Sequence, residues 1–234
     1  MEKSRTRILI TGLCLQGNKG GPALALSAMK LLKQHMEANF CFSVPQSSFE
    51  LEMKWATKYG VPVVPQIGTY EWLPPLAFRR KSMLHFSSFH AALHESDVIL
   101  DSSGIAYLGG LTSLKSILDS HLIYALASSH DKPFFRLTQS YGPFTGLFMK
   151  ALAKRELNRS PVLLARGEIS RQRLEELHLK ARIRDFPDVA FLLDPADAKW
   201  ANDYLRSEVG VLDGGIMLGI SPSATRTPEV ECHG

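Results

Sequence analysis

Residues 8–24 read ILITGLCLQGNKGGPAL, and this stretch decides the fold class. The apolar run 8–11 has the length of a short buried strand, and the glycine-rich segment 17–22 follows it. From Ala23 to about Glu37, apolar residues recur at intervals of three and four, which places them on one face of a helix. The order of strand, glycine-rich loop and helix is the repeating unit of a parallel α/β sheet.

The same alternation continues along the chain. The pattern predicts strands at 40–44, 61–64, 98–100, 134–138 and 162–165, and helices at 48–59, 76–95, 114–129, 146–158 and 169–177. Parallel strands need crossover connections, and right-handed crossovers place helices on both faces of the sheet. The fold class is therefore expected to be α/β, a doubly wound parallel sheet of Rossmann-like type.

Three residues mark the ends of these elements. Ser47, with Glu50 three positions on, is expected to cap the helix 48–59. Gly60 is expected to end that helix in a left-handed conformation. Pro62 lies within the strand 61–64 and indicates an edge position, because proline cannot donate to the sheet ladder.

The regular alternation of predicted strands and helices ends at about Ile183. The run 189–193 is expected to be the last strand of a first domain, 1–194, and a connector with a helix over 196–207 follows at 195–214. The run 216–220 then has the pattern of a strand that opens a second domain, 215–234. A strand needs neighbours to satisfy its backbone, so we expect this second domain to be truncated.

Composition narrows the class of protein. With 45% hydrophobic and 21% charged residues the chain is typical of a globular protein, and no apolar run reaches the roughly 20 residues that span a bilayer. The net charge of +4 is too weak and too dispersed to favour nucleic acid. Cys14, Cys41 and Cys232 show no paired spacing, and the first residues lack a signal-peptide core. A reducing, cytoplasmic location is expected, and the oligomeric state stays open.

The candidate ligand-binding segments follow predicted strands. The loop 17–22 could offer backbone N–H groups to an anion at the start of a helix, or be a tight turn, and it lacks the spacing of dinucleotide and P-loop motifs. The turn 101–104 carries hydroxyls that suit phosphate or sugar, although such loops are common. Gln139 could bond a carboxylate or a hydroxyl, in a segment that also reads as a turn.

Arg166 ends a predicted strand and precedes a helix that carries Glu168 and Ser170 in its first turn. Its guanidinium could bind a phosphate or carboxylate, or it could form a local ion pair with Glu168 or another nearby acid. His90 and His94 have a metal-ligand spacing on a predicted helix, but no third ligand accompanies them and no metal is predicted. From the residues alone, the prediction is an anion-binding α/β domain.

Five segments resemble the polysaccharide pyruvyl transferase family. The loop 17–24 looks like the family's GNxGDxAL loop, and 96–104 is similar to its AD-V strand and glycine-rich turn. The further matches are 139–144 with GQSIGPF, 166–170 with R-D/E-x-x-S and 188–193 with DxAFLL. The order along the chain agrees with that of the family.

The resemblance implies a GT-B-like fold of two Rossmann-like domains and transfer of the enolpyruvyl unit of phosphoenolpyruvate to a sugar of a cell-surface glycan or its lipid-linked precursor. It implies no cofactor beyond this donor, and it leaves peripheral contact with a lipid-linked glycan open. The donor-binding arginine and the acid histidine of the family lie largely in the second domain, so no catalytic residue is assigned. The implied substrate-binding residues are Gly17, Asn18, Gly20, Ser103, Gly104, Gln139, Arg166 and Ser170.

The chain departs from the family pattern at three places. Gly21 stands where the pattern has Asp, Gly167 where it has an acid, and Ser102-Ser103 where glycines are usual. Two alternatives therefore stay open. One is a GT-B glycosyltransferase that uses a nucleotide sugar, and the other is an inactive, truncated domain that binds a sugar or an anion.

Overall fold

The computed structural model describes residues 5–16, 19–68, 80–107 and 111–210. The chain divides into two compact units, Met1–Leu193 and Asp194–Gly234.

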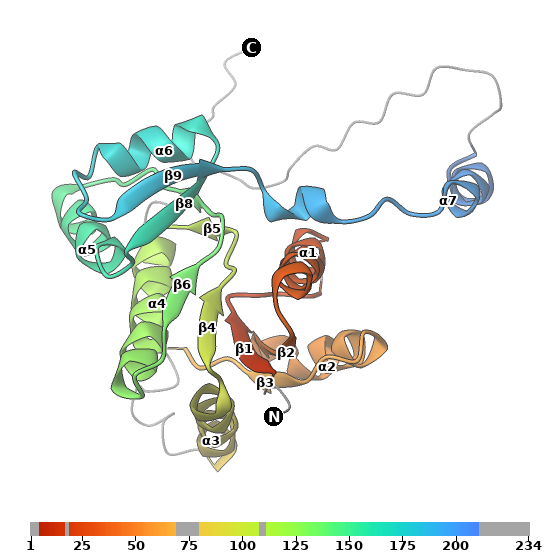
Figure 1. Ribbon diagram of the computed structural model, residues 1–234, viewed down its shortest axis with the longest axis horizontal. Helices are drawn as coiled ribbons and strands as arrows, with labels where there is room; N and C mark the ends of the chain where they lie inside the picture. The colour runs from red at the N-terminus through yellow and green to blue at the C-terminus, as the bar shows by residue number, and fades with distance from the viewer. Residues whose placement is uncertain (1–4, 17–18, 69–79, 108–110, 211–234) are drawn as a thin grey trace. The chain divides into compact units, whose positions relative to one another are not determined.

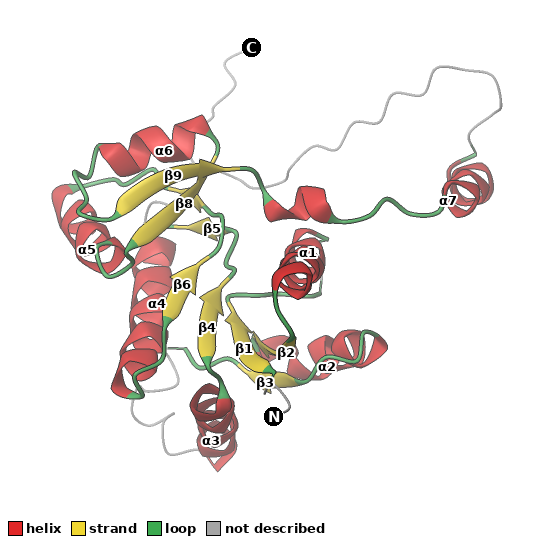
Figure 2. Ribbon diagram, viewed as in Figure 1, coloured by secondary structure: helices red, strands yellow, loops and turns green. Residues whose placement is uncertain are grey.

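A five-stranded parallel sheet forms the centre of the first unit, in the order β3-β2-β1-β4-β6. Its strands are β1 (Thr6–Thr11), β2 (Ala38–Val44), β3 (Val63–Pro65), β4 (Val98–Asp101) and β6 (Phe134–Arg136). They lie side by side among the helices (Figure 1, Figure 2). β3 is an edge strand of this sheet, as Pro62 predicted, and Pro62 accepts a hydrogen bond from Phe42 N through its carbonyl.

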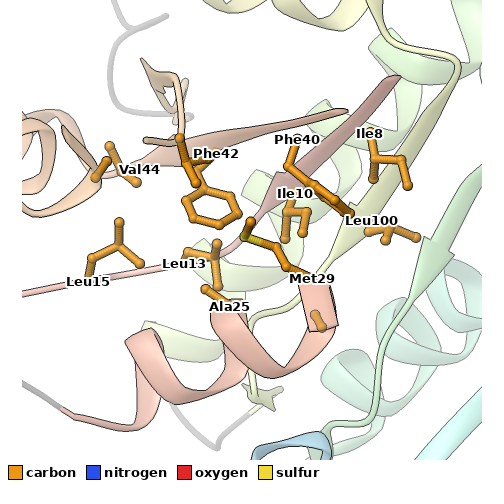
Figure 3. Close-up of a cluster of buried hydrophobic side chains, with 13 residues drawn as sticks. Ile8, Ile10, Leu13, Leu15, Ala25, Met29, Phe40, Phe42, Val44 and Leu100 are labelled. Atoms are coloured by element: carbon orange, nitrogen blue, oxygen red, sulfur yellow. The ribbon is translucent and has the colours of Figure 1, made fainter. Parts of the chain in front are cut away.

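Helices cover both faces of this sheet. Ile8 and Ile10 of β1 belong to a buried cluster with residues of α1 (Gly20–His35) and α2 (Phe49–Lys58), as Figure 3 shows for α1. Leu9, between them, packs in a cluster with residues of α3 (Arg80–Glu95) and α4 (Leu111–Ser129). Side chains of a strand alternate between the two faces, so β1 contributes to both layers. The prediction of a doubly wound α/β fold is confirmed.

A third buried cluster extends the first unit beyond β6. It joins β8 (Val162–Arg166) with α5 (Leu147–Leu157) and α6 (Glu168–Glu175). β8 pairs with β9 (Arg182–Phe186) in a separate two-stranded parallel sheet, and a single parallel bridge joins Gln139 to Ala165. The sequence pattern did not predict β9, because this strand is mostly exposed and has no apolar face to reveal it.

The predicted last strand, 189–193, was wrong. The segment Val189–Leu192 is instead a 3-10 helix, η4, which Asp188 caps by accepting a hydrogen bond from Ala190 N at 2.9 Å. η4 packs against α1, where Lys30 Nζ donates to Leu192 O at 3.1 Å. The apolar run that suggested a strand is largely exposed, with Phe191 at 85%.

The predicted cap at Ser47 was also wrong. A short 3-10 helix, η1 (Gln46–Ser48), precedes α2, and the N-cap residue Ser48 makes no side-chain capping bond. Its hydroxyl donates to Glu52 Oε1 at 3.1 Å. Gly60 has a φ of 65°, so the left-handed end of this helix is confirmed.

The second unit contains α7 (Ala198–Tyr204), which continues into a π-helical turn, η5 (Leu205–Val209). This agrees with the helix expected over 196–207. Asp197 caps α7 by accepting from Trp200 N at 2.9 Å. The predicted strand 216–220 lies outside the described residues. Among the helices that the structure describes, none combines the length and the apolar character needed to cross a membrane.

Candidate functional site

A cavity of about 280 Å³ lies where β1 and β4 end at the carboxyl edge of the sheet. Its wall includes Thr11 and Gly12 at the end of β1, and Asp101 and Ser103 at the end of β4. Further lining residues are Gln66 after β3, and Lys115, Asp119 and Ser120 from α4. The chain leaves β1 toward β2 and β3 and returns to the other side at β4, so the strand order reverses here. Open α/β sheets bind ligands at this position.

Gly12 lets the end of β1 pass directly against the turn after β4. A Cβ at this position would lie 2.2 Å from Ser103 Oγ and 2.8 Å from Asp101 Oδ1, and its φ is 75°. The Gly12 N–H donates to Gln66 Oε1 at 3.1 Å. Sequence reasoning did not single out Gly12 or Gln66, because the signal is a close approach between segments far apart in the chain.

Glu52 of α2 accepts hydrogen bonds from the loop that leads from β1 to α1. The side chain is fully buried, and it accepts from Leu15 N at 2.7 Å and from Gln16 N at 3.3 Å. These bonds satisfy both the carboxylate and the backbone of the loop. Glu52 was not predicted as a site residue, since an acidic residue in a helix normally indicates an exposed face.

Asp101 is held from two sides at the cavity wall. Ser103 Oγ donates to Asp101 Oδ1 at 2.5 Å, and Arg136 Nη1 donates to Asp101 Oδ2 at 3.1 Å. The exposed fractions of the Arg136 and Asp101 side chains are only 1% and 8%. Arg136 Nη1 also donates to Ser120 Oγ at 3.2 Å. The carboxylate is therefore charge-paired and fixed in orientation.

Two buried tyrosines lie in the same region of the first unit. Burial raises the pKa of Tyr107 and of Tyr141, so both phenols stay neutral hydrogen-bond donors. Tyr107 lines the cavity, and its backbone has a φ of 62°, an unusual value for a bulky residue.

The turn after β4 pairs with the segment after β6. β5 (Ile105–Ala106) and β7 (Ser140–Tyr141) form a small parallel sheet, and Ser140 N donates to Gly104 O at 2.9 Å. Gln139 is fully buried, and its Nε2 lies 3.4 Å from Asp101 O. Its backbone carbonyl accepts from Arg166 N at 2.9 Å, which joins this segment to β8.

Arg166 bonds two different segments of the first unit. Its Nε donates to Ser140 Oγ at 2.9 Å, and its Nη1 donates to Asp188 Oδ2 at 2.7 Å. The local ion pair considered from the sequence therefore forms with Asp188, whereas Glu168 pairs with Arg171. The Arg166 side chain stays 24% exposed, and its Nη2 makes no hydrogen bond within the described residues. Ser170 is buried and accepts from Tyr141 N at 3.3 Å.

A family model described as polysaccharide pyruvyl transferase matches residues 18–227, which is most of the chain. The chain belongs to this family. None of the curated proteins compared with it matches the sequence.

Among solved structures, those of HepE from Anabaena are similar to this pyruvyl transferase family member. The structure of HepE in complex with UDP-glucose has 10% sequence identity and a TM-score of 0.49, and the match covers 79% of this chain and 44% of HepE. The complex with UDP and glucose has 16% identity, a TM-score of 0.46 and the same coverage. MurG from Acinetobacter baumannii has 11% identity and a TM-score of 0.27, over 84% of this chain and 70% of MurG. The chain thus spans less than half the length of HepE.

The segments that resemble the pyruvyl transferase motifs contact one another in sequence order. Leu24 of the first segment lies against Gly104 of the second, where a Cβ would come within 2.9 Å of Leu24 Cδ1. Gly104 bonds Ser140 of the third segment, Ser140 bonds Arg166 of the fourth, and Arg166 bonds Asp188 of the fifth. The five motif segments therefore form one continuous set of contacts in the first unit.

The predicted site residues fall into three groups. Gly17 and Asn18 lie outside the described residues, and Gly20 is the first residue of α1. Ser103 lines the cavity, and Gly104 follows it with a φ of 69°. Gln139, Arg166 and Ser170 all contact β7 or its flanks and do not line the cavity.

His90 and His94 both contact His130, which their spacing in the sequence did not indicate. His90 Nε2 and His130 Nε2 lie 2.9 Å apart, and the His94 ring packs edge-on against that of His130. Among the described residues, however, no group of three or more histidine, cysteine or acidic side chains has an arrangement that could hold a metal ion.

Proposed function

We propose that this chain carries the sugar- and donor-binding surface of a polysaccharide pyruvyl transferase, which moves a pyruvyl group from phosphoenolpyruvate to a saccharide. The observation that carries the proposal is the family match over residues 18–227, in a chain whose motif segments meet at the carboxyl edge of the sheet. The acceptor is proposed to be a sugar of a cell-surface glycan or of its precursor, handled in the cytoplasm.

The pyruvyl transfer reaction determines which chemical groups this surface must bind. Two sugar hydroxyls add to C2 of phosphoenolpyruvate, its methylene carbon takes a proton, and inorganic phosphate leaves with the other proton. The product is a ketal that retains the carboxylate. The donor therefore needs cationic groups on its phosphate and carboxylate, and the acceptor needs a group that takes up a hydroxyl proton.

Arg166 is the residue that we assign to the donor. Its Nη2 is available, its side chain is partly exposed, and its other nitrogens hold the guanidinium in place through Ser140 and Asp188. Arg173 reaches the same small strand by donating from Nη1 to Tyr141 O at 3.3 Å. An arginine with one side fixed and one side available suits an anionic oxygen.

The test is calorimetric titration of the chain with phosphoenolpyruvate. Saturable binding is expected, with affinity lower by about tenfold or more in Arg166→Gln, because a charged hydrogen bond is lost. Arg171→Gln is the matched control. Arg171 lies on α6, close in sequence, but its side chain is paired with Glu168, Glu175 and Asp185. The control is expected to bind like the parent chain.

Two results would contradict the proposal. One is the absence of phosphoenolpyruvate binding together with binding of a nucleotide sugar, which favours the glycosyltransferase alternative. The other is binding that is equally weakened in both arginine variants. Binding without ketal formation in the presence of saccharides would instead favour the inactive binding domain.

A further inference from the structure

The cavity between β1 and β4 has a lining that differs in character from the surroundings of Arg166. Among the described residues that line it, Lys115 is the cation, and its Nζ is bonded to Asp119 Oδ2. Arg136 does not line the cavity; its Nη1 is paired with Asp101, while its Nε and Nη2 are buried without a hydrogen-bond partner among the described residues. The side chains of Lys115 and Arg136 are thus each paired with a carboxylate. Phosphate sites usually present uncommitted arginine, lysine or backbone N–H groups, so this wall does not suit a dianion.

Hydrogen-bonding capacity is nevertheless available on the wall. The carboxylate of Asp101 accepts three hydrogen bonds, from Ser103 N, Ser103 Oγ and Arg136 Nη1, and can accept about one more, since an ionised carboxylate can accept about four. Gln66 accepts from Gly12 N through Oε1, and its Nε2 makes no bond within the described part of the chain. The phenol oxygen of Tyr107 is buried, and its approach to Ser120 does not meet the geometry of an ordinary hydrogen bond.

A buried polar group without a partner is costly, and in native structures it is usually satisfied by water or a ligand. Tyr107 is 3% exposed and lines the cavity, so a ligand in the cavity could serve that role. The strained backbone at Tyr107 is a second feature of the kind found at ligand sites.

We propose that this cavity binds the hydroxyl groups of a neutral sugar ring, with Asp101 and Gln66 as the groups that recognise them. A hydroxyl both donates and accepts, and the wall offers an acceptor at Asp101 and donors at Gln66 and Tyr107. Drug-sized ligands occupy pockets of roughly 300–1,000 Å³, and the cavity of about 280 Å³ suits a smaller ligand of monosaccharide size. The inference rests on the proposed function and assigns the acceptor to this cavity.

Saturation-transfer NMR of the whole chain with methyl glycosides of glucose, galactose and mannose tests the assignment. Ring-proton signals are expected for at least one glycoside, and excess inorganic phosphate is not expected to displace it. Asp101→Asn is expected to reduce the signal about tenfold or more, because the charged acceptor is lost.

Asp101→Asn also removes the partner of a buried arginine, so this variant is at risk of misfolding. Ser103→Leu is the second variant, because Ser103 is exposed at the cavity wall and a larger apolar side chain there blocks entry; it removes the hydroxyl bond to Asp101 but keeps the carboxylate that pairs with Arg136. Ser87→Leu is its matched control, since Ser87 is an exposed serine of α3 that does not line the cavity. The signal is expected to vanish in Ser103→Leu and to persist in Ser87→Leu.

The cavity assignment is overturned if no glycoside gives a signal, if the signal survives in Ser103→Leu, or if phosphate competes for it. The same samples are titrated with phosphoenolpyruvate. Donor binding without any glycoside signal overturns this inference and leaves the proposed function standing. The chain could instead bind no phosphoenolpyruvate and still give a glycoside signal that is lost in Ser103→Leu and unaffected by phosphate. That result supports the cavity assignment and contradicts phosphoenolpyruvate as the donor.

Discussion

At the scale of single residues, glycines decide how closely the segments of the site approach one another. Gly12 allows contact with Ser103, and Gly104 allows contact with Leu24. Gly21 is the position where the family pattern has Asp. A Cβ there would lie 1.8 Å from the carbonyl oxygen of Cys14, so the observed backbone excludes any side chain. This departure from the pattern has a steric cause.

The Gly21→Asp variant, which restores the family residue, is expected to lower the free energy of unfolding by about 3 kcal/mol, because backbone atoms cannot move aside cheaply. Urea denaturation measures the change. Gly167→Asp is the comparison, since nothing lies within 4 Å of its Cβ position and only its φ of 84° opposes a side chain. That variant is expected to cost about 1 kcal/mol. Equal losses in the two variants would refute the steric explanation.

At the scale of elements, Asp97 links β1 to β4 by hydrogen bonds at the edge of the sheet opposite the cavity. Asp97 Oδ2 accepts from Arg7 N at 2.8 Å, and Asp97 N donates to Arg7 O at 2.8 Å. Asp97 belongs to the motif segment 96–104, so this segment contributes to strand pairing as well as to the cavity. The register that results, Ile8 beside Val98, brings Thr11 beside Asp101 at the cavity.

The hydrogen bond from Arg7 N lowers the pKa of Asp97 below its ordinary value, and the charge of Arg7 adds to the effect. A lowered pKa in the folded state means that the contribution to stability is complete above the unfolded value of about 3.9 and is lost as the pH falls through the folded pKa. The Asp97→Asn variant should therefore be less stable than the parent chain at pH 7. The difference should shrink as the pH approaches 3.

Urea unfolding midpoints of the parent chain and the variant, measured at pH 7 and near pH 3, check this expectation. Glu37→Gln serves as the control, because Glu37 is an exposed acid whose side chain pairs with Arg5 at 3.7 Å, and the substitution leaves the bond from Thr6 N to the Glu37 carbonyl in place. A stability difference for Asp97→Asn that stays constant with pH would show that the carboxylate charge is irrelevant.

At the scale of the molecule, the buried clusters all belong to residues 1–193. The two faces of the central sheet supply two of them, and β8 with α5 and α6 supplies the third. In the second unit α7 has no buried residue, and Trp200 is 60% exposed. Burial of apolar surface is the main source of stability, so the described part of the second unit adds little to it.

A chain shortened to residues 1–193 is accordingly expected to have nearly the same free energy of unfolding in urea as one shortened to residues 1–210, within about 1 kcal/mol. Circular dichroism follows the transition. The control is a chain shortened to residues 1–157, which lacks β8, α6 and β9. It is expected to lose cooperative unfolding. A large loss of stability on removal of 194–210 would contradict the expectation that these exposed residues add little to the stability of the fold.

The sequence by itself determined the strands and helices of the central sheet, its doubly wound class and the family. Local periodicity suffices for this, because the faces of a helix or strand must alternate in polarity to be half-buried. The tertiary structure decided the strand β9, the 3-10 helix at Val189–Leu192 and the partners of the site residues. Arg136 meets Asp101 across 35 residues, Glu52 meets Leu15 across 37, and Arg166 meets Asp188 across 22. Such contacts leave no periodic trace in the sequence, because they depend on how distant segments pack and not on the pattern within any one of them.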